Sequence, residues 1–318
     1  MTRKILVTGG AGFIGANLVR RLLHEGNEVV VIDNLSRGFA SYLPSHVTLM
    51  EGDIRDTPFL TENMNNADIV IHLAAYGSVV ESVDDPYTNF DINAYGTFSV
   101  LDAARQAMVK KVIFASTGGA LIGDAEPPVD EKSLPKPISP YGSSKLCGEA
   151  YCHSFAKVYG LNTICLRFAN VYGPYSAHKK GAVTKFIKCL LKGSDIPIFG
   201  DGSASRDFLH VDDLCSGILS AIDVKNEPGE VYHLASENEV TILSLAKILS
   251  DIAGKNKHPI SHFDKRPGEV ARNFAKYDKA KRELGFEPKI DFKQGLQSTW
   301  QWFLERKDEV LNLKEFDS

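Results

Sequence analysis

Two side chains of one predicted helix have the types and the spacing to remove a proton from a substrate hydroxyl. Tyr141 and Lys145 are four residues apart, directly after Ser139 and Pro140. Four residues is about one helical turn, so both side chains lie on the same face of the helix. An ammonium beside a phenol favours the phenolate and lowers the pKa of the tyrosine, which would make Tyr141 a general base near neutral pH. The spacing alone is weak evidence, because an exposed aromatic residue and a lysine also occur at it by chance.

Two hydroxyl side chains strengthen this hypothesis. Ser116 and Thr117 directly follow a predicted strand, Lys111–Ala115, and precede Gly118 and Gly119. Ligands of a doubly wound sheet bind beyond the carboxyl ends of its strands, so a hydroxyl at this position opens onto the ligand site. It could donate to the substrate oxygen or relay its proton. The other interpretation of these residues is an ordinary turn.

A glycine-rich stretch near the N-terminus predicts a site for phosphates. Residues 4–15 read KILVTGGAGFIG, in which an apolar run precedes Gly9, Gly12 and Gly15. Apolar residues then recur at helical spacing from Phe13. A strand, glycine turn and helix in this order let the backbone approach a pyrophosphate, to which the helix presents free N–H groups and a partial positive charge. A tight turn that holds nothing is the other interpretation.

An acidic residue after the next predicted strand indicates which dinucleotide binds. Asp33 follows the strand Glu28–Ile32 and lies 18 residues after Gly15, where a carboxylate can accept hydrogen bonds from the adenosine ribose. The same carboxylate repels a 2′-phosphate, so we expect NAD rather than NADP. Arg37 is close in the sequence and could weaken this preference, although a solvated loop cation is the simpler interpretation.

The elements that position these residues alternate between strands and helices through the first half of the chain. Such alternation predicts an α/β protein with a doubly wound parallel sheet and helices on both faces. The further predicted strands are Val47–Leu49, Ala67–Leu73 and Asn162–Phe168, and the long helices are Tyr87–Met108, with Phe90, Ala94, Thr97, Leu101 and Ala104 on one face, and Tyr141–Tyr159.

The second half of the chain lacks this regular alternation, and we interpret it as a smaller domain on the substrate side. We expect a dinucleotide-binding domain over residues 1–172, with returning segments from about 207–235, and a second domain mainly over residues 173–318. The predicted helices here are Ala182–Leu191, Val211–Ile222, Thr241–Ile252 and Phe292–Leu304, with a strand at Glu230–Leu234 and turn-rich stretches at Gly173–Gly181 and Ile196–Arg206.

The composition excludes several classes of function. The net charge is −4 without a basic block, so nucleic acid and anionic membranes are not expected partners. The five cysteines form neither a CxxC pair nor a His/Cys cluster, so we interpret them as free thiols in a reducing compartment and expect no metal site. No apolar run approaches the roughly 20 residues of a membrane helix, and the first residues do not resemble a signal peptide. We therefore expect a cytoplasmic protein.

Motifs along nearly the whole chain resemble those of the extended short-chain dehydrogenases/reductases in the NAD-dependent epimerase/dehydratase family, and those of UDP-glucose 4-epimerases most of all. The resemblance is highly specific for the family and much less so for the substrate. It implies a Rossmann fold with a smaller C-terminal substrate-binding domain, bound NAD and a UDP-sugar substrate. The motifs are TGGAGFIG at 8–15, DN at 33–34, GDIRD at 52–56, HLAA at 72–75, N-x-x-G-T at 93–97, ST at 116–117, SPYGSSK at 139–145, LRFANVYGP at 166–174, IFGDG, RDF and VDD between 198 and 213, and RPGE at 266–269.

The resemblance also implies roles for residues at matching positions. Thr117, Tyr141 and Lys145 would be catalytic, with Ser116 in support. The guanidinium groups of Arg206 and Arg266 suit paired contacts with a diphosphate. The residues expected to contact NAD are Gly9, Gly12, Phe13, Ile14, Asp33, Asn34, Asp53, Ile54, Leu73, Ala75, Asn93, Tyr141, Lys145 and Phe168. Those expected to hold the nucleotide sugar are Asn170, Val183, Ile198, Arg206, Arg266 and Glu269.

The implied reaction inverts C4 of the sugar in UDP-glucose, UDP-N-acetylglucosamine or UDP-glucuronate. Tyr141 takes the proton of the 4-hydroxyl, hydride passes from C4 to the nicotinamide, the flat 4-keto sugar turns over, and hydride returns to its other face. No net oxidation occurs, so NAD would stay bound between turnovers.

The residues after Thr117 favour an epimerase within the family. Dehydratases of the family carry an acid pair after this threonine, and decarboxylases carry a glutamate next to the hydroxyl residue. Here Gly118, Gly119 and Ala120 follow, with no carboxylate. A decarboxylase or a reductase of a 4-keto sugar is the alternative among enzymes, and a non-catalytic NAD-binding regulator is the alternative outside them.

A few further residues bear on the sugar and on assembly. Asn273 falls where the family has a residue that limits the space for the sugar, and it is small enough to admit an N-acetyl group. His178, Lys179 and Lys180 lie in a substrate-side loop and could meet a uronate carboxylate, although solvated side chains are the simpler interpretation. The family commonly dimerises through its two long helices, so the resemblance also implies a homodimer.

Overall fold

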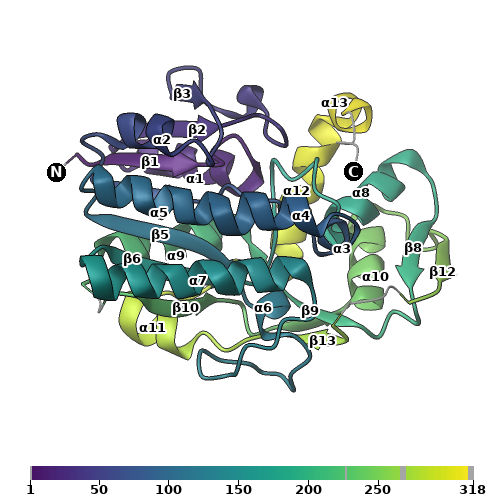
Figure 1. Cartoon of the computed structure of the whole chain (residues 1–318). Coiled ribbons are helices and arrows are strands. Elements are labelled where there is room, and N and C mark those ends of the chain that lie inside the picture. Colours follow the sequence, from purple (N-terminus) through teal and green to yellow (C-terminus); the bar gives the residue numbers. More distant parts are fainter. Residues whose placement is uncertain (1, 226–227, 266–269, 314–318) are drawn as a thin grey trace.

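The computed structural model of the chain describes residues 2–225, 228–265 and 270–313. The RPGE motif lies outside these residues, and with it Arg266 and Glu269, two of the residues expected to hold the nucleotide sugar. Figure 1 shows a sheet covered by helices, with further short strands and helices at the end of the molecule opposite the N-terminus.

The main sheet has seven strands, each parallel to its neighbours, in the order β10-β6-β5-β4-β1-β2-β3. This arrangement confirms the predicted α/β class with a doubly wound parallel sheet. Most residues of these strands are buried, as expected of a parallel sheet covered on both faces. The strands are β1 (Lys4–Thr8), β2 (Glu28–Asp33), β3 (Thr48–Glu51), β4 (Ile69–His72), β5 (Lys111–Thr117), β6 (Asn162–Phe168) and β10 (Glu230–Leu234).

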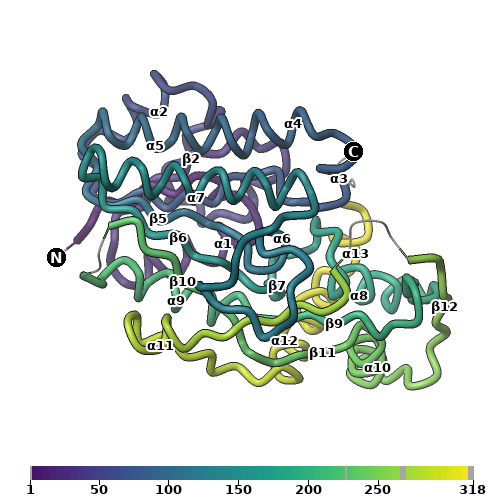
Figure 2. Tube along the Cα trace, turned by 60° about the horizontal axis from the view of Figure 1, so that its bottom comes forward, coloured from purple at the N-terminus to yellow at the C-terminus, as the bar shows by residue number. Residues whose placement is uncertain are grey.

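Alternate side chains of the strands point to opposite faces and bury two groups of helices. Ile5 and Val7 belong to the core on one face, whereas Leu6 belongs to the core on the other. Figures 1 and 2 both show α5 and α7 side by side along the second face. The first face is covered by α1 (Phe13–His24), α9 (Val211–Asp223) and α11 (Asp278–Leu284), and the second by α2 (Thr57–Met64), α5 (Gly96–Gln106) and α7 (Pro140–Tyr159).

Two predicted elements differ in detail from the structure. β5 extends to Thr117, so Ser116 and Thr117 are its last residues rather than residues of a following turn. The helix predicted over residues 87–108 is interrupted by a π-helical turn, η2 (Asp91–Tyr95), between α4 (Pro86–Phe90) and α5. This wider turn changes the helical register, so Phe90 is exposed while the other four residues predicted on its face are buried.

The second half of the chain contains short strands that the sequence did not reveal. The turn-rich stretch at residues 196–206 holds β8 and the start of β9, interrupted by glycines at 200 and 202 that hide any period-two pattern. β9 pairs with β7, β11 and β13, and β8 pairs with β12. These strands are β7 (Asn170–Tyr172), β8 (Ile196–Phe199), β9 (Ser205–His210), β11 (Glu239–Thr241), β12 (Ile260–Phe263) and β13 (Arg272–Asn273).

Helices around these strands bury a second core. Figures 1 and 2 place α8, α10, β8 and β12 opposite the N-terminus, at which β1 begins. Because all seven strands of the main sheet are parallel, their carboxyl ends face these elements. The helices of this core are α8 (Ala182–Lys192), α10 (Ile242–Ile252), α12 (Phe292–Glu305) and α13 (Lys307–Asn312), and the remaining short elements are η1 (Ala40–Tyr42), α3 (Val79–Asp84) and α6 (Gly119–Ile122).

Candidate active site

α7 begins beyond the carboxyl end of β5, and its first turn carries Tyr141. Ser139 caps the helix by accepting a hydrogen bond from the Gly142 N–H at 3.2 Å, and Pro140 occupies the first turn, where its missing N–H leaves no bond unmade. Gly142 allows close packing, because a Cβ there would lie 2.0 Å from the Ala120 carbonyl oxygen. The local sequence therefore fixes the start of α7 against the chain that follows β5.

The three residues predicted to be catalytic lie together at this end of β5. The side chains of Tyr141 and Thr117 are hydrogen-bonded. Lys145 Nζ donates to the Ala115 carbonyl oxygen at 2.9 Å and lies 6.0 Å from the centre of the Tyr141 ring. Lys145 is buried, whereas Tyr141 and Thr117 are partly exposed. The arrangement leaves a phenol and a hydroxyl accessible next to a buried ammonium.

The pKa of Tyr141 differs from the expectation. Burial raises it to about 12, and the hydrogen bond with Thr117 opposes this effect only in part. The Lys145 ammonium is directed to the Ala115 carbonyl oxygen rather than to the phenol oxygen. Burial lowers the pKa of Lys145 to about 8, against the opposing effects of Cys152 and Glu149. In the structure the pKa of Tyr141 is therefore raised, not lowered as expected from the spacing of Tyr141 and Lys145.

Ser116 points away from Tyr141. Its hydroxyl donates to Glu149 Oε1 at 2.6 Å, and both residues are buried. Glu149 also accepts from Arg167 Nε and Nη2, at 2.9 and 2.8 Å. Neither Glu149 nor Arg167 is among the predicted site residues. The signal that could have revealed Glu149 is its position four residues after Lys145, on the same helix face.

The glycine turn fits the pyrophosphate of a dinucleotide. α1 starts at Phe13, and its N-cap residue, Gly12, makes no side-chain capping bond, so the first N–H groups of the helix are available to a phosphate. Gly9 has a φ of +70°, and a Cβ on it would lie 2.6 Å from the Ala74 nitrogen. Only glycine therefore brings this turn so close to the chain that follows β4.

Asp33 holds the glycine turn in place. Its Oδ2 accepts a hydrogen bond from the Ala11 N–H at 2.9 Å, and its Oδ1 accepts one from the Leu35 N–H at 2.9 Å. Burial raises the pKa of this carboxyl group, and the two bonds oppose the rise. Each carboxylate oxygen can accept a second hydrogen bond, so Asp33 keeps the capacity to accept from ribose hydroxyls.

The other residues expected to contact NAD follow the carboxyl ends of neighbouring strands. Asn34 donates to Asp53 Oδ2 at 3.3 Å, and the hydrogen bond from Arg55 lowers the pKa of Asp53 to about 2. Asn93, in the π-helical turn, accepts from the Tyr76 N–H at 2.7 Å. Gly12, Phe13 and Ile14 form the start of α1, Ile54 follows β3, Leu73 and Ala75 follow β4, and Phe168 ends β6.

The described residues expected to hold the nucleotide sugar differ in their exposure and in the elements to which they belong. Asn170 is exposed at the start of β7, and Arg206 is partly buried in β9, where its Nη1 donates to the Ser205 carbonyl oxygen at 2.7 Å. Val183 and Ile198 lie in the second core. Neither the side chain nor the backbone of Ile198 has exposed surface in the structure.

Asn273 lies beside Gly119, two positions after Thr117. β13 pairs with β9 so that Asn273 is opposite Arg206. A Cβ on Gly119 would lie 1.4 Å from Asn273 Nδ2, so the amide occupies the space of a side chain at this position. The structure thus brings the residue expected to limit the sugar site next to the chain that follows Thr117, the threonine predicted to be catalytic.

Two cations interpreted as solvated are instead paired with one buried carboxylate. Arg37 Nη1 donates to Glu81 Oε2 at 2.7 Å, and its guanidinium lies 4.2 Å from the centre of the Tyr76 ring. Lys180 Nζ lies 2.7 Å from Glu81 Oε1, although half of its side chain is exposed. Arg37 is therefore held by Glu81 and Tyr76 rather than solvated, whereas Lys180 is paired and still half exposed.

The two residues before Lys180 also differ from expectation. Lys179 Nζ lies 5.1 Å from the centre of the Phe13 ring, and burial lowers its pKa to about 8. His178 packs against Phe39, with ring centres 5.6 Å apart, and burial lowers its pKa to about 4. Neither side chain is solvated, because the loop folds back onto the start of α1 and the chain after β2.

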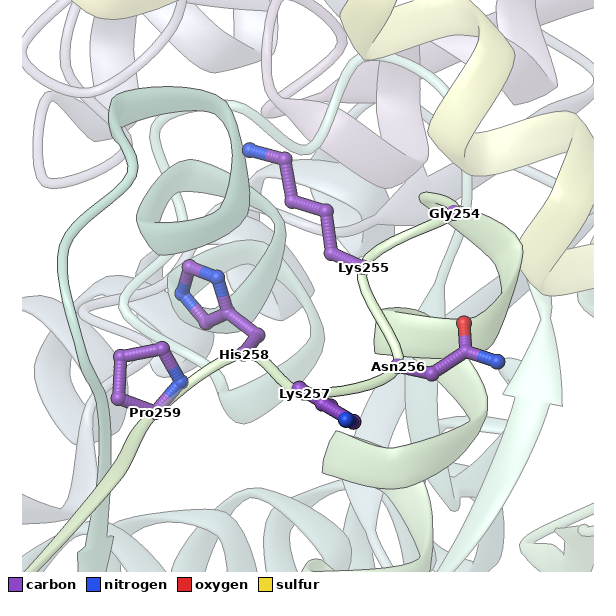
Figure 3. Close-up of a pocket in the computed structure, with 6 residues that line it drawn as sticks. All are labelled: Gly254, Lys255, Asn256, Lys257, His258 and Pro259. Atoms are coloured by element: carbon purple, nitrogen blue, oxygen red, sulfur yellow. The ribbon is translucent and has the colours of Figure 1, made fainter.

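A surface hollow of about 560 Å³ lies after α10, lined by residues 254–259. Figure 3 shows these residues, which include none of the predicted site residues. Lys255 Nζ donates to the Leu190 carbonyl oxygen at 2.5 Å, and His258 Nε2 lies 2.8 Å from the Ser194 carbonyl oxygen. Both side chains thus bind the end of α8 and its following turn.

The described part of the chain lacks two further kinds of feature. No group of three or more His, Cys, Asp and Glu side chains there could hold a metal ion. No helix of residues 2–225, 228–265 or 270–313 combines the length and the apolar character needed to cross a membrane.

Comparison with known proteins relates this geometry to a family. The family described as "NAD dependent epimerase/dehydratase family" matches residues 5–235. A putative UDP-glucose 4-epimerase of Methanocaldococcus jannaschii is 38% identical, over 94% of this chain and 97% of the relative. The crystal structure of a UDP-glucose 4-epimerase from Thermotoga maritima with UDP-glucose has a TM-score of 0.92 and 37% identity, over 96% of this chain and 99% of that one.

Related enzymes of different specificity are similar as well. The structure of a UDP-glucuronic acid 4-epimerase from Bacillus cereus, in complex with UDP-glucuronic acid and NAD, has a TM-score of 0.88 and 32% identity, over 95% of this chain and 99% of that one. Some dTDP-glucose 4,6-dehydratases also match, so similarity alone leaves the reaction to be decided by the site. On the family match and these near full-length relatives, the chain belongs to the NAD-dependent epimerase/dehydratase family.

Proposed function

We propose that the chain is an NAD-dependent 4-epimerase of UDP-sugars. The observation that carries this proposal is that Thr117, Tyr141 and Lys145 lie together at the end of β5 and that two glycines directly follow Thr117. Inversion at C4 needs a proton acceptor and a hydroxyl near the sugar, whereas elimination of water across C5 and C6 needs a further acid and base. Gly118 and Gly119 supply neither.

In this proposal Tyr141 is the general base for the 4-hydroxyl of the sugar. Bound NAD would supply the acceptor and donor of the C4 hydride and a positive charge near the phenol. Burial raises the pKa of Tyr141 to about 12, so its phenolate forms only where further positive charge lies near it. Thr117 holds the phenol by a hydrogen bond and can relay its proton, and Lys145 supplies an ammonium on the same helix face.

We further propose that the first part of the chain, residues 1–172 with a returning segment from about 207–235, holds NAD. The uncapped start of α1, the turn at Gly9 and the carboxylate of Asp33 support this assignment. The membership of β10 in the main sheet supports the returning segment. The full set proposed to contact NAD is Gly9, Gly12, Phe13, Ile14, Asp33, Asn34, Asp53, Ile54, Leu73, Ala75, Asn93, Tyr141, Lys145 and Phe168.

Residues 173–318 would mainly hold the nucleotide sugar. Arg206 suits a diphosphate, and Asn273 beside it would limit the space for the sugar. Asn170, Val183 and Ile198 are proposed to complete this part of the site. Arg266 and Glu269 remain proposed contacts on the basis of the sequence resemblance.

Incubation of the purified protein with UDP-glucose, UDP-N-acetylglucosamine and UDP-glucuronate, each separately, tests the proposal. We expect the C4 epimer of at least one of them, with no net change in NADH. Release of CO₂ would instead indicate a decarboxylase, and net NADH consumption with a 4-keto sugar would indicate a reductase. A folded, NAD-loaded protein that inverts none of the three would contradict the proposal.

We also propose a homodimer formed through α4, α5 and α7. These helices expose a group of aromatic side chains: Tyr87, Phe90, Phe98, Tyr151 and Tyr159. The Phe98 and Tyr151 rings are 5.4 Å apart, so part of the group is continuous across two helices. A contiguous apolar patch of this kind favours a partner surface. Light scattering should give twice the chain mass, and Phe98→Glu should give the mass of one chain.

A cytoplasmic location is proposed on the state of the cysteines. All five are free thiols in the structure, and four of them are buried. Free thiols persist in a reducing compartment. Fractionation of the source cells should find the protein with cytoplasmic markers.

A further inference from the structure

Three side chains on one face of α7 bond to three consecutive residues at the end of β5. Tyr141, Lys145 and Glu149 are spaced by four residues. Tyr141 is hydrogen-bonded to Thr117, Lys145 donates to the carbonyl of residue 115, and Glu149 Oε1 accepts from Ser116. Tyr141 and Lys145 therefore make two of three bonds between α7 and the end of β5, and Glu149 makes the third.

Glu149 is itself held in one position. Both of its oxygens accept hydrogen bonds from Arg167, which lies in β6 directly opposite Ser116 in β5. Glu149 is 7% exposed and Arg167 is 4% exposed, so water does not screen the pair. A two-bond contact between a guanidinium and a carboxylate fixes geometry as well as charge. α7, β5 and β6 are thus locked together one helical turn from Lys145.

The charges around Lys145 show what Glu149 does there. On α7, Glu149 and Cys152 favour the ammonium and burial opposes it. On β5, the Phe114 ring centre lies 4.9 Å from Lys145 Nζ. On β4, His72 is uncharged at neutral pH because burial lowers its pKa to about 3. Tyr141, neutral when its pKa is about 12, and Arg167, which is bonded to Glu149, also lie near this face.

We propose that Glu149 is a positioning residue for the reaction, whose buried carboxylate keeps the Lys145 amine charged beside Tyr141 and fixes the end of β5 through Ser116. Its effect on the rate rests on the proposed epimerase function. Its effect on the Lys145 amine does not, so the two can be tested apart.

Glu149→Gln isolates the charge, because glutamine keeps the shape and an oxygen that can accept from Ser116. Without the carboxylate, burial acts on Lys145 with less opposition, so the ammonium loses its proton at lower pH. If the reaction needs the ammonium, the alkaline limb of the pH profile of kcat/KM must move in the same direction.

The test is a titration of the Lys145 amine, followed by NMR of protein labelled with ¹⁵N at the lysine side chains and assigned by the loss of the signal in Lys145→Met. We expect the midpoint in Glu149→Gln to fall by at least half a pH unit, and the alkaline limb of kcat/KM to shift equally. Asp213→Asn is the matched control, since Asp213 is a buried carboxylate that accepts from the N–H groups of Lys289 and Ile290. It should lower Tm and leave both midpoints unchanged.

A second variant keeps the test informative if Glu149→Gln does not fold. Glu149→Gln leaves the Arg167 charge buried and unpaired, which is destabilising, whereas Glu149→Gln with Arg167→Met removes both charges. The double variant should fold and still titrate at lower pH than the wild type. An unchanged midpoint in either folded variant would overturn the proposal. A shifted midpoint in a protein that inverts no UDP-sugar would count against the epimerase alone.

Discussion

The side-chain amide of Asn273 lies where a side chain on Gly119 would have to extend. A Cβ on Gly119 would be 1.4 Å from Asn273 Nδ2, much closer than two such atoms can approach. The backbone at Gly119 cannot move away from Asn273, because Gly119 is buried and its carbonyl oxygen accepts from the Gly123 N–H at 2.9 Å. The missing side chain at 119 and the amide at 273 are therefore one feature of the site, contributed by two distant parts of the chain.

Gly119→Ala should change which UDP-sugars are accepted more than it changes stability. The new methyl must push the Asn273 amide aside, and the end of a flexible side chain can move at small cost. The displaced amide takes space from the sugar, so kcat/KM should fall about tenfold more for the bulkier of two UDP-sugars. Gly119→Ala with Asn273→Ala should recover most of this loss. Steady-state kinetics of the wild type, both single variants and the double variant measure the coupling, and additive effects would show that the two residues act independently.

Tyr141→Phe should lower kcat by about 10²–10⁴-fold, because the ring stays and only the proton acceptor is lost. The NAD content of the purified protein should not change, and Tm should fall only slightly with the loss of the bond to Thr117. Tyr151→Phe removes the same hydroxyl from an exposed position on the same helix and is expected to keep full activity. A Tyr141→Phe protein that still inverts C4 at the wild-type rate would exclude Tyr141 as the base, and a regulator would be the better interpretation.

The features of the fold that the sequence predicts are those with a local signal. The run at residues 5–7, the glycines after it and the pattern from Phe13 identify a strand, turn and helix without knowledge of the rest of the chain. The strands β8 and β9 have no such signal, because their few residues are stabilised by partners such as β12, more than 60 residues away. The π-helical turn at residues 91–95 escapes prediction because the apolar residues on both sides of it fit one helical period in the sequence, although the turn shifts the register and exposes Phe90.

The features of the site likewise divide into those with a local signal in the sequence and those set by the folded chain. The spacing of Tyr141 and Lys145 is local, and the structure places both at the end of β5. The direction of the Tyr141 pKa shift is not local, because burial by the folded chain outweighs the hydrogen bond with Thr117. The pairing of Arg37 with Glu81, 44 residues further on, is likewise set by tertiary structure. Sequence alone therefore identifies reactive groups better than it identifies their partners.

Asp33→Asn should weaken the retention of NAD through the glycine turn as well as through the ribose. Both oxygens of Asp33 accept from backbone N–H groups, and an asparagine has only one oxygen, so one N–H faces an NH₂ group. We expect a loss of about 1–3 kcal/mol in the free energy of unfolding and a purified protein with markedly less NAD. Asp56→Asn is the control, because Asp56 caps α2 through the Phe59 N–H. It should keep the NAD content, which is read by absorbance after denaturation, and equal NAD content in both variants would contradict this role of Asp33.

Lys145→Met should remove most of the activity and raise stability at neutral pH. The pKa of Lys145 is about 8 in the fold against 10.5 for the free side chain, so carrying the buried charge costs about 3 kcal/mol below pH 8. Between pH 8 and 10.5 the unfolded chain binds more protons than the folded one, so this cost disappears as pH rises. Methionine avoids it but leaves the Ala115 carbonyl without its donor, which offsets about 1–2 kcal/mol.

The expected gain of Lys145→Met is thus about 1–2 kcal/mol at pH 7, and above about pH 10 the variant should be the less stable protein. Urea unfolding of the NAD-free proteins at pH 7 and pH 10 measures both values, because bound NAD, which Lys145 is proposed to contact, would itself stabilise the fold. Lys111→Met is the matched control. Lys111 is buried too, but its Nζ donates to the carbonyl oxygens of Ala221, Ile222 and Val224, so its removal should destabilise at neutral pH. A Lys145→Met protein that is less stable than the wild type at pH 7 would show that the ammonium stabilises the fold, as the one at Lys111 does, and that the site does not hold it at a cost.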